Sequence, residues 1–139
     1  MSDTSRRAFL SNTGKLAMAS GFTTLAVNNE TTITAKNMFI HHVYFWLNNP
    51  NSKEDLQSLL EGLKKLSKVK NIKTFHIGVP ASTNRDVIER SYSVSWMLIF
   101  ENMEEEEKYQ VDPIHLKFVE ECKHLWSKVI VYDSVDANI

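Results

Sequence analysis

The run Tyr109-Gln-Val-Asp-Pro-Ile-His-Leu-Lys-Phe118 places a phenol and an imidazole on either side of a helix that begins at a proline. Asp112 is a favourable N-cap residue, and Pro113 suits the first helical position, where its missing N–H leaves no hydrogen bond unmade. His115 is therefore expected in the first turn of this helix, where the positive end of the helix dipole opposes protonation of its ring. The run predicts a neutral histidine held beside a tyrosine.

Strand and helix patterns alternate around this run in a regular order. Strand-like runs rich in β-branched and aromatic residues cover 38–47, 72–79, 92–100 and 129–132. Leucines at helical spacing follow Ser52, and a short acidic helix begins after Asn102 and ends near Tyr109. Together with the helix at Pro113, the main elements read βαββαβ. This order predicts an α+β fold, a ferredoxin-like sandwich.

The first predicted strand is apolar on both of its faces. Alternation places His41, Val43, Phe45 and Leu47 on one face and Ile40, His42, Tyr44 and Trp46 on the other. Helices on one face of such a sheet leave the other face uncovered, and that face is too apolar to remain in water. We therefore expect a homodimer in which two sheets close against each other.

Composition limits the kinds of protein that the chain can be. With 139 residues it has room for one domain, and 16 Lys and Arg residues against 17 Asp and Glu residues argue against nucleic-acid binding. The single cysteine, Cys122, rules out an internal disulfide, and no Cys/His cluster has the spacing of a zinc site. No run of 18 apolar residues predicts a transmembrane span.

The first residues differ in character from the rest of the chain. Ser5-Arg-Arg-Ala-Phe-Leu10 resembles the twin-arginine export signature, and residues 14–27 are small and moderately apolar. Residues 28–37 are polar and read as a linker. We expect 1–37 to be an export signal-like segment with its linker, 38–135 to be the folded domain, and the protein to be exported to a periplasmic or extracytoplasmic site. The alternative is a cytoplasmic protein whose tail carries a chance Arg-Arg pair.

Residues 38–135 resemble the stress-responsive A/B barrel (Dabb) domain, a family within the dimeric α/β-barrel superfamily. The resemblance is carried by the opening His41-x-Val43-x-Phe45-x-Leu47, Gly78 at the end of the second strand, the third strand 92–100, Tyr109-x-x-x-Pro113-x-His115-x-x-Phe118, and the final run 126–133. It implies a ferredoxin-like fold, a homodimer and no cofactor.

The resemblance also implies roles for three residues. Members of the family are functionally mixed, and several are stress proteins without a settled reaction. One relative, the plant olivetolic acid cyclase, closes a polyketide chain by aldol condensation without a cofactor. Its tyrosine and histidine in this motif match Tyr109 and His115, and its first-strand histidine matches His41. It has a histidine where this chain has Asp112, which changes the charge at the rim of the pocket.

Two hypotheses remain open for these residues. In the first, His115 removes a proton next to a carbonyl, Tyr109 donates a hydrogen bond to the developing enolate, and His41 lines the pocket. The chain would then catalyse a cyclase- or lyase-like reaction on a carbonyl-bearing or aromatic ligand, with no metal. In the second, the chain is a non-enzymatic stress-response dimer whose Tyr and His are packing elements. The hypotheses differ in whether a cavity lies beside the pair.

Overall fold

The structure, a computed structural model, describes residues 37–139. Almost all of the predicted export segment and linker lies outside these residues, so export stays a prediction. The elements along the described chain are β1 (Phe39–Leu47), α2 (Lys53–Leu66), β2 (Thr74–Gly78), β3 (Val94–Phe100), α3 (Met103–Gln110), α4 (Pro113–Cys122), the short 3₁₀ turn η2 (Lys123–Leu125) and β4 (Trp126–Val135). None of the helices in this part of the chain is long and apolar enough to cross a membrane.

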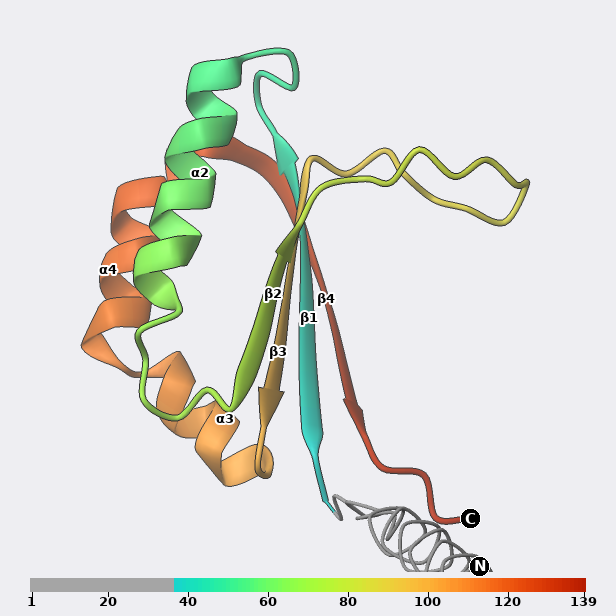
Figure 1. Cartoon of the computed structure of the whole chain (residues 1–139). Helices are drawn as coiled ribbons and strands as arrows, with labels where there is room; N and C mark the ends of the chain where they lie inside the picture. The colour runs from blue at the N-terminus through green and yellow to red at the C-terminus, as the bar shows by residue number, and fades with distance from the viewer. Residues whose placement is uncertain (1–36) are drawn as a thin grey trace, which may run out of the picture. The chain divides into compact units, whose positions relative to one another are not determined.

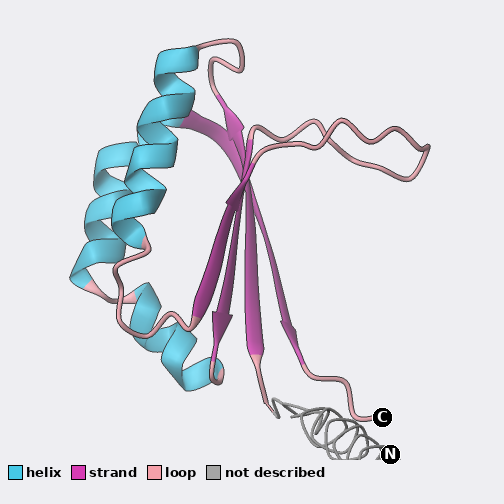
Figure 2. Ribbon diagram, in the orientation of Figure 1, coloured by secondary structure: helices cyan, strands magenta, loops and turns pink. Residues whose placement is uncertain are grey.

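The four strands form one antiparallel sheet in the order β2-β3-β1-β4, and the helices pack on one of its faces (Figure 1). Figure 2 shows the two layers of residues 37–139, with the helices on one side of the strands and the loop between β2 and β3 projecting on the other. This arrangement confirms the predicted α+β, ferredoxin-like fold. The short helix α3 is an addition to the βαββαβ order, and it was also predicted.

Side-chain caps fix where each helix begins. Ser52 Oγ accepts a hydrogen bond of 3.1 Å from the backbone N–H of Asp55 at the start of α2. Asn102 accepts one of 3.0 Å at the start of α3, and Asp112 accepts one of 2.8 Å at the start of α4. The three caps satisfy backbone donors that have no partner within their helices, which confirms the predicted helix starts.

The core lies between the sheet and the helices. Exposure alternates along β1, so that every second side chain is buried beneath the helices. The largest fully buried side chains come from all the layers around this core, namely Trp96, Tyr109, Phe100, Leu59, Leu63, Leu66, Leu98 and Val94. Because the sheet buries one face here, the predicted alternation of β1 is confirmed.

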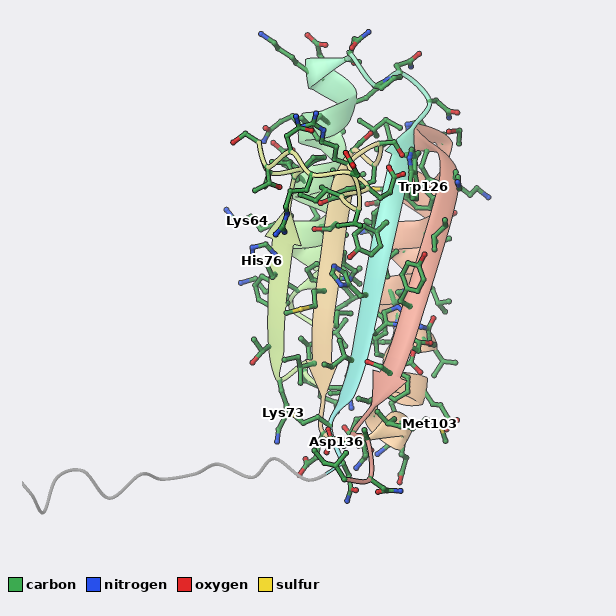
Figure 3. All side chains as sticks on the ribbon, turned by 90° about the vertical axis from the view of Figure 1, so that its right-hand side faces the viewer. Lys64, Lys73, His76, Met103, Trp126 and Asp136 are labelled. Carbon is green, nitrogen blue, oxygen red and sulfur yellow. The ribbon has the colours of Figure 1, made fainter. Side chains whose placement is uncertain are left out.

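Among residues 37–139, no helix lies over the opposite face of the sheet, and Figure 3 views the molecule from this side. Ile40, His42, Tyr44 and Trp46 are only half-buried there, and the strand register places Met97 of β3 directly beside His42. His76 of β2 lies on the same face, opposite Met97. The chain between β2 and β3, residues 79–93, projects away from the helices on this side (Figure 1).

Candidate functional site

The two residues of the motif come together through the joint between α3 and α4. Tyr109 lies in the last turn of α3, and His115 lies in the first turn of α4. Only Val111 and the N-cap Asp112 separate the two helices, so both side chains turn toward the sheet. Their ring centroids are 4.6 Å apart, and that of Tyr109 is 6.0 Å from the ring of His41 on β1. All three predicted site residues therefore lie in one cluster.

A cavity of about 150 Å³ lies against this cluster, and His41, Tyr109 and His115 all line it. The other lining side chains are mostly apolar, and they include Val43, Phe45, Phe118, Trp126, Val129 and Val131. Val129 and Val131 on the edge strand β4 are 37 % and 44 % exposed, which places the mouth of the cavity beside β4. A cavity of roughly this volume holds a single benzene-sized molecule.

His115 is held in one orientation by the backbone at the end of α3. Its Nδ1 lies 3.0 Å from the carbonyl oxygen of Gln110. Because a carbonyl can only accept, Nδ1 carries the hydrogen, and the lone pair of the neutral ring lies on Nε2. Burial lowers the pKa of His115 below its ordinary value of 6.5, although the Gln110 carbonyl acts in the opposite direction. The ring is thus neutral near pH 7, as predicted, with burial as the main cause.

Tyr109 is a buried phenol with a defined hydrogen bond. Only 1 % of its surface is exposed, and its hydroxyl oxygen accepts a hydrogen bond of 3.2 Å from Nε1 of Trp96. Burial raises the pKa of Tyr109 well above its usual range, so the hydroxyl keeps its proton. Trp96 occupies one of the two lone pairs of the hydroxyl oxygen, and the hydroxyl keeps its own hydrogen to donate to a ligand.

His41 is oriented by two carboxylates that sequence reasoning did not identify as site residues. Its Nδ1 lies 2.7 Å from Oδ1 of Asp133 on β4 and 3.7 Å from Oε1 of Glu106 on α3. His41 and Glu106 are both buried. Asp133 stands directly opposite His41 in the pairing of β1 with β4, so only the strand register could have revealed it. Glu106 belongs to an acidic run whose pattern is typical of a solvated helix face. The sequence pattern therefore did not indicate that this side chain points inward.

No metal site accompanies the cluster within residues 37–139, because no three His, Cys, Asp or Glu side chains there converge on a common point. The expectation that the pocket works without a metal or cofactor stays a prediction. Cys122, buried on α4, lies outside the cavity wall.

Comparison with known proteins places the fold. The sequence model of the Stress responsive A/B Barrel Domain family matches residues 39–136 of this chain. No curated protein matches the sequence. A Dabb family protein with a ferredoxin-like fold from Mesorhizobium loti has a TM-score of 0.62 at 21% identity, over 74% of this chain and 100% of its own.

Two further solved structures share this fold. The hydroxynitrile lyase from Passiflora edulis has a TM-score of 0.61 at 14% identity, over 74% of this chain and 96% of its own. A dimeric protein of unknown function and ferredoxin-like fold from Bacteroides fragilis has a TM-score of 0.54 at 18% identity, over 70% and 94% of the two chains. At these identities the likeness extends to the fold alone.

Proposed function

The chain belongs to the stress-responsive A/B barrel domain family, and we propose that its cavity binds a compact carbonyl-bearing or aromatic ligand on which His115 acts as a general base. The observation that carries the proposal is the hydrogen bond from His115 Nδ1 to the carbonyl oxygen of Gln110, with a length of 3.0 Å. It leaves the Nε2 lone pair of a neutral imidazole as the basic atom in a cavity that Tyr109 also lines.

The proposed chemistry is a proton transfer coupled to the formation of an oxyanion. Nε2 of His115 takes a proton from a carbon next to a carbonyl, and the C–H electron pair forms the C=C bond of an enolate while the carbonyl π pair moves to its oxygen. If the proton comes from a hydroxyl of the ligand instead, the electron pair stays on that oxygen as an alkoxide. The hydroxyl of Tyr109 donates a hydrogen bond to the oxygen on which negative charge develops. Trp96 supports this role, because its N–H donates to the same hydroxyl and makes the phenol a stronger donor.

The size and walls of the cavity define the ligand class. Its volume of about 150 Å³ fits one ring or a short chain, and a longer substituent would leave through the mouth beside β4. Apolar and aromatic walls favour an aryl or alkyl group over a sugar or a nucleotide. A cyclase-like or a lyase-like step would both begin with the proton transfer described above.

A second candidate is a non-enzymatic dimer in which the same residues are packing elements. It is favoured by the polar contacts already made within the protein, since the Tyr109 hydroxyl pairs with Trp96 and His115 Nδ1 pairs with backbone. The two candidates differ in the role of Nε2 of His115. This atom accepts a proton from the ligand if the chain is an enzyme, and it has no role in proton transfer if His115 is a packing element.

Proton removal can be measured directly with a simple probe. Acetophenone in heavy water should exchange its methyl hydrogens for deuterium faster with the full chain than in buffer, as followed by proton NMR. His115→Asn keeps a donor close to the Gln110 carbonyl but has no basic nitrogen, so the enzyme-dependent rate should fall by about a hundredfold or more. His124→Asn, the same change at an exposed histidine, should leave the rate unchanged. Equal rates in the wild type and His115→Asn would support the packing role.

We also propose that the chain forms a homodimer through the uncovered face of its sheet. That face carries half-buried aromatic side chains, including stacked rings of His42 and Tyr44 whose centroids are 4.4 Å apart. A second copy would exclude water from them, as sheet-on-sheet packing does elsewhere. The similar protein from Bacteroides fragilis is described as dimeric.

Export by a twin-arginine route is proposed from the sequence alone. Arg6 and Arg7 with the following Phe9 and Leu10 carry this proposal. Replacing both arginines by lysine should retain the protein in the cytoplasm of a bacterial host that has the pathway, whereas Arg85→Lys/Arg90→Lys should not. Unchanged fractionation of the Arg6→Lys/Arg7→Lys variant would contradict export by this route.

A further inference from the structure

A second and larger hollow lies between two helices of the helical layer. It has a volume of about 680 Å³ and runs between the C-terminal half of α2 and α4, which pack side by side (Figure 1). Gly62 lines the groove, and a side chain at this position would collide with α4. A Cβ atom on Gly62 would lie 2.6 Å from Sγ of Cys122 and 3.2 Å from the ring of Phe118. We call this hollow the α2–α4 groove.

The floor of the α2–α4 groove is apolar and partly open. Ile114 is 38 % exposed within it, and Leu66 and Phe118 form its deepest part. Leu66 and Phe118 also line the cavity that contains His115, so the two hollows adjoin each other at these side chains. The volume lies within the range of about 300–1,000 Å³ that is typical of small-molecule sites.

Cations surround this apolar floor. Lys64, Lys65 and Lys68 line the groove from α2 or just beyond its end, and Lys117 lines it from α4. Among residues 37–139, only Glu61 and Glu121 oppose these four lysines at the rim, although the chain as a whole has a net charge of −1. Within residues 37–139, Lys117 pairs with Glu121 at 3.7 Å, whereas the three lysines of the α2 side make no salt bridge.

We propose that the α2–α4 groove binds an amphipathic carboxylate, of the class of medium-chain fatty acids or arylalkanoic acids. The apolar body would lie on Ile114, Leu66 and Phe118, and the carboxylate would meet Lys65 and Lys68 at the rim. An apolar floor alone would bind any hydrophobic molecule, and a basic rim alone would bind any anion. Their combination selects a ligand that carries both features.

Position along α2 explains why the lysines are available for a ligand. Lys64 and Lys65 lie in the last turn of the helix, where positive charge offsets the negative end of the helix dipole. This role needs no carboxylate partner, so the ammonium groups stay in water with their charge uncompensated. The site uses neither His115 nor Tyr109, and it therefore stands apart from the acid–base function proposed for the inner cavity.

Titration of the full chain with decanoate tests the proposal. Calorimetry at low salt should detect one site, and NMR should show the largest amide shifts at Gly62, Leu66 and Ile114. Binding should weaken as salt is added, because exposed charges are screened. Lys65→Gln/Lys68→Gln should weaken binding by about five- to tenfold, the effect of two exposed charge pairs. Lys53→Gln/Lys123→Gln removes the same charge outside the groove and should bind as the wild type does.

A second pair of variants tests the floor without relying on the lysines. Ile114→Glu places a negative charge in the groove and should abolish binding, whereas Ile114→Gln should weaken it only slightly. His115→Asn should bind decanoate as the wild type does, which separates this site from the acid–base function. Equal binding of decyltrimethylammonium and decanoate would overturn the proposal. So would an acidic amphipathic peptide that binds the groove when decanoate does not, since the occupant would then be a protein.

Discussion

At the scale of single residues, the hydrogen bond from His115 to Gln110 decides what the candidate site can do. It runs from a ring in the first turn of α4 to the last carbonyl of α3, so the joint between two helices sets the orientation of the base. The Tyr109 ring packs against the same imidazole with a centroid distance of 4.6 Å. A shift of α3 or α4 would therefore change the position of both His115 and Tyr109.

The buried imidazole should make stability depend on pH. The pKa of His115 lies below 6.5 in the folded chain and near 6.5 in the unfolded chain, so the unfolded chain binds more protons as the pH falls. This contribution to stability is fully present above about pH 6.5 and is lost as the pH falls through and below that value. Urea unfolding at about pH 7.5 and about pH 5.5 should show a smaller decline for His115→Asn than for the wild type. A decline of equal size in both proteins would contradict this origin.

Removal of the Tyr109 hydroxyl should expose the value of its pairing with Trp96. Tyr109→Phe leaves Nε1 of the buried Trp96 without an acceptor, which should lower the free energy of unfolding by about 1–3 kcal/mol. Trp96→Phe and the double variant complete a double-mutant cycle, whose coupling energy should be about 1 kcal/mol in denaturant unfolding. Tyr92→Phe, the same change at a half-buried tyrosine, is the control. A coupling energy of zero would show that the bond is not formed.

At the scale of elements, the close approach of α2 and α4 depends on Gly62. Gly62→Ala improves helix propensity by about 1 kcal/mol, yet its Cβ would lie 2.6 Å from Sγ of Cys122. The overlap should dominate and destabilise the chain by about 1–3 kcal/mol, because a packed core has no room for another methyl group. In a Cys122→Ala background the same change should cost less, since the nearest atom is gone. Thermal unfolding of the four proteins measures both effects, and an equal cost in both backgrounds would contradict this packing.

Short-range sequence patterns predicted where the helices begin better than they predicted the extent of strands that pair with distant segments. The caps at Ser52, Asn102 and Asp112 depend on a few neighbouring residues, and all three are found as the sequence predicts. The last strand was predicted as 129–132, whereas β4 runs from Trp126 to Val135. Its outer residues become strand because β1 pairs with them, and pairing between distant segments has no local signal.

The site residues that the sequence predicted also differ from those that it missed in whether their role depends on strand pairing. His41, Tyr109 and His115 were predicted to share a site, and they line one cavity. Trp96 and Asp133 were missed as partners because their roles follow from the positions of β3 and β4 in the sheet. The roles of all these residues in binding or catalysis stay predictions.

At the scale of the whole molecule, the uncovered sheet face should hold two chains together. Met97 lies on this face in the central part of β3, so Met97→Lys would place a charge inside the proposed interface. Light scattering coupled to size exclusion should show a dimer for the wild type and a monomer for Met97→Lys. Leu116→Lys, on the exposed side of α4, should remain dimeric. A wild-type monomer at high concentration, or a Met97→Lys dimer, would contradict this interface.

The edge strand β4 determines when, during synthesis of the chain, the site can be completed. It follows every other described element in the order of synthesis, yet it contributes Trp126, Val129 and Val131 to the cavity and Asp133 to His41. A nascent chain that ends after α4 already contains Tyr109 and His115 but has no outer wall beside them. The pocket can therefore close only when this strand has left the ribosome, and a chain cut short before β4 would present its histidines to open water.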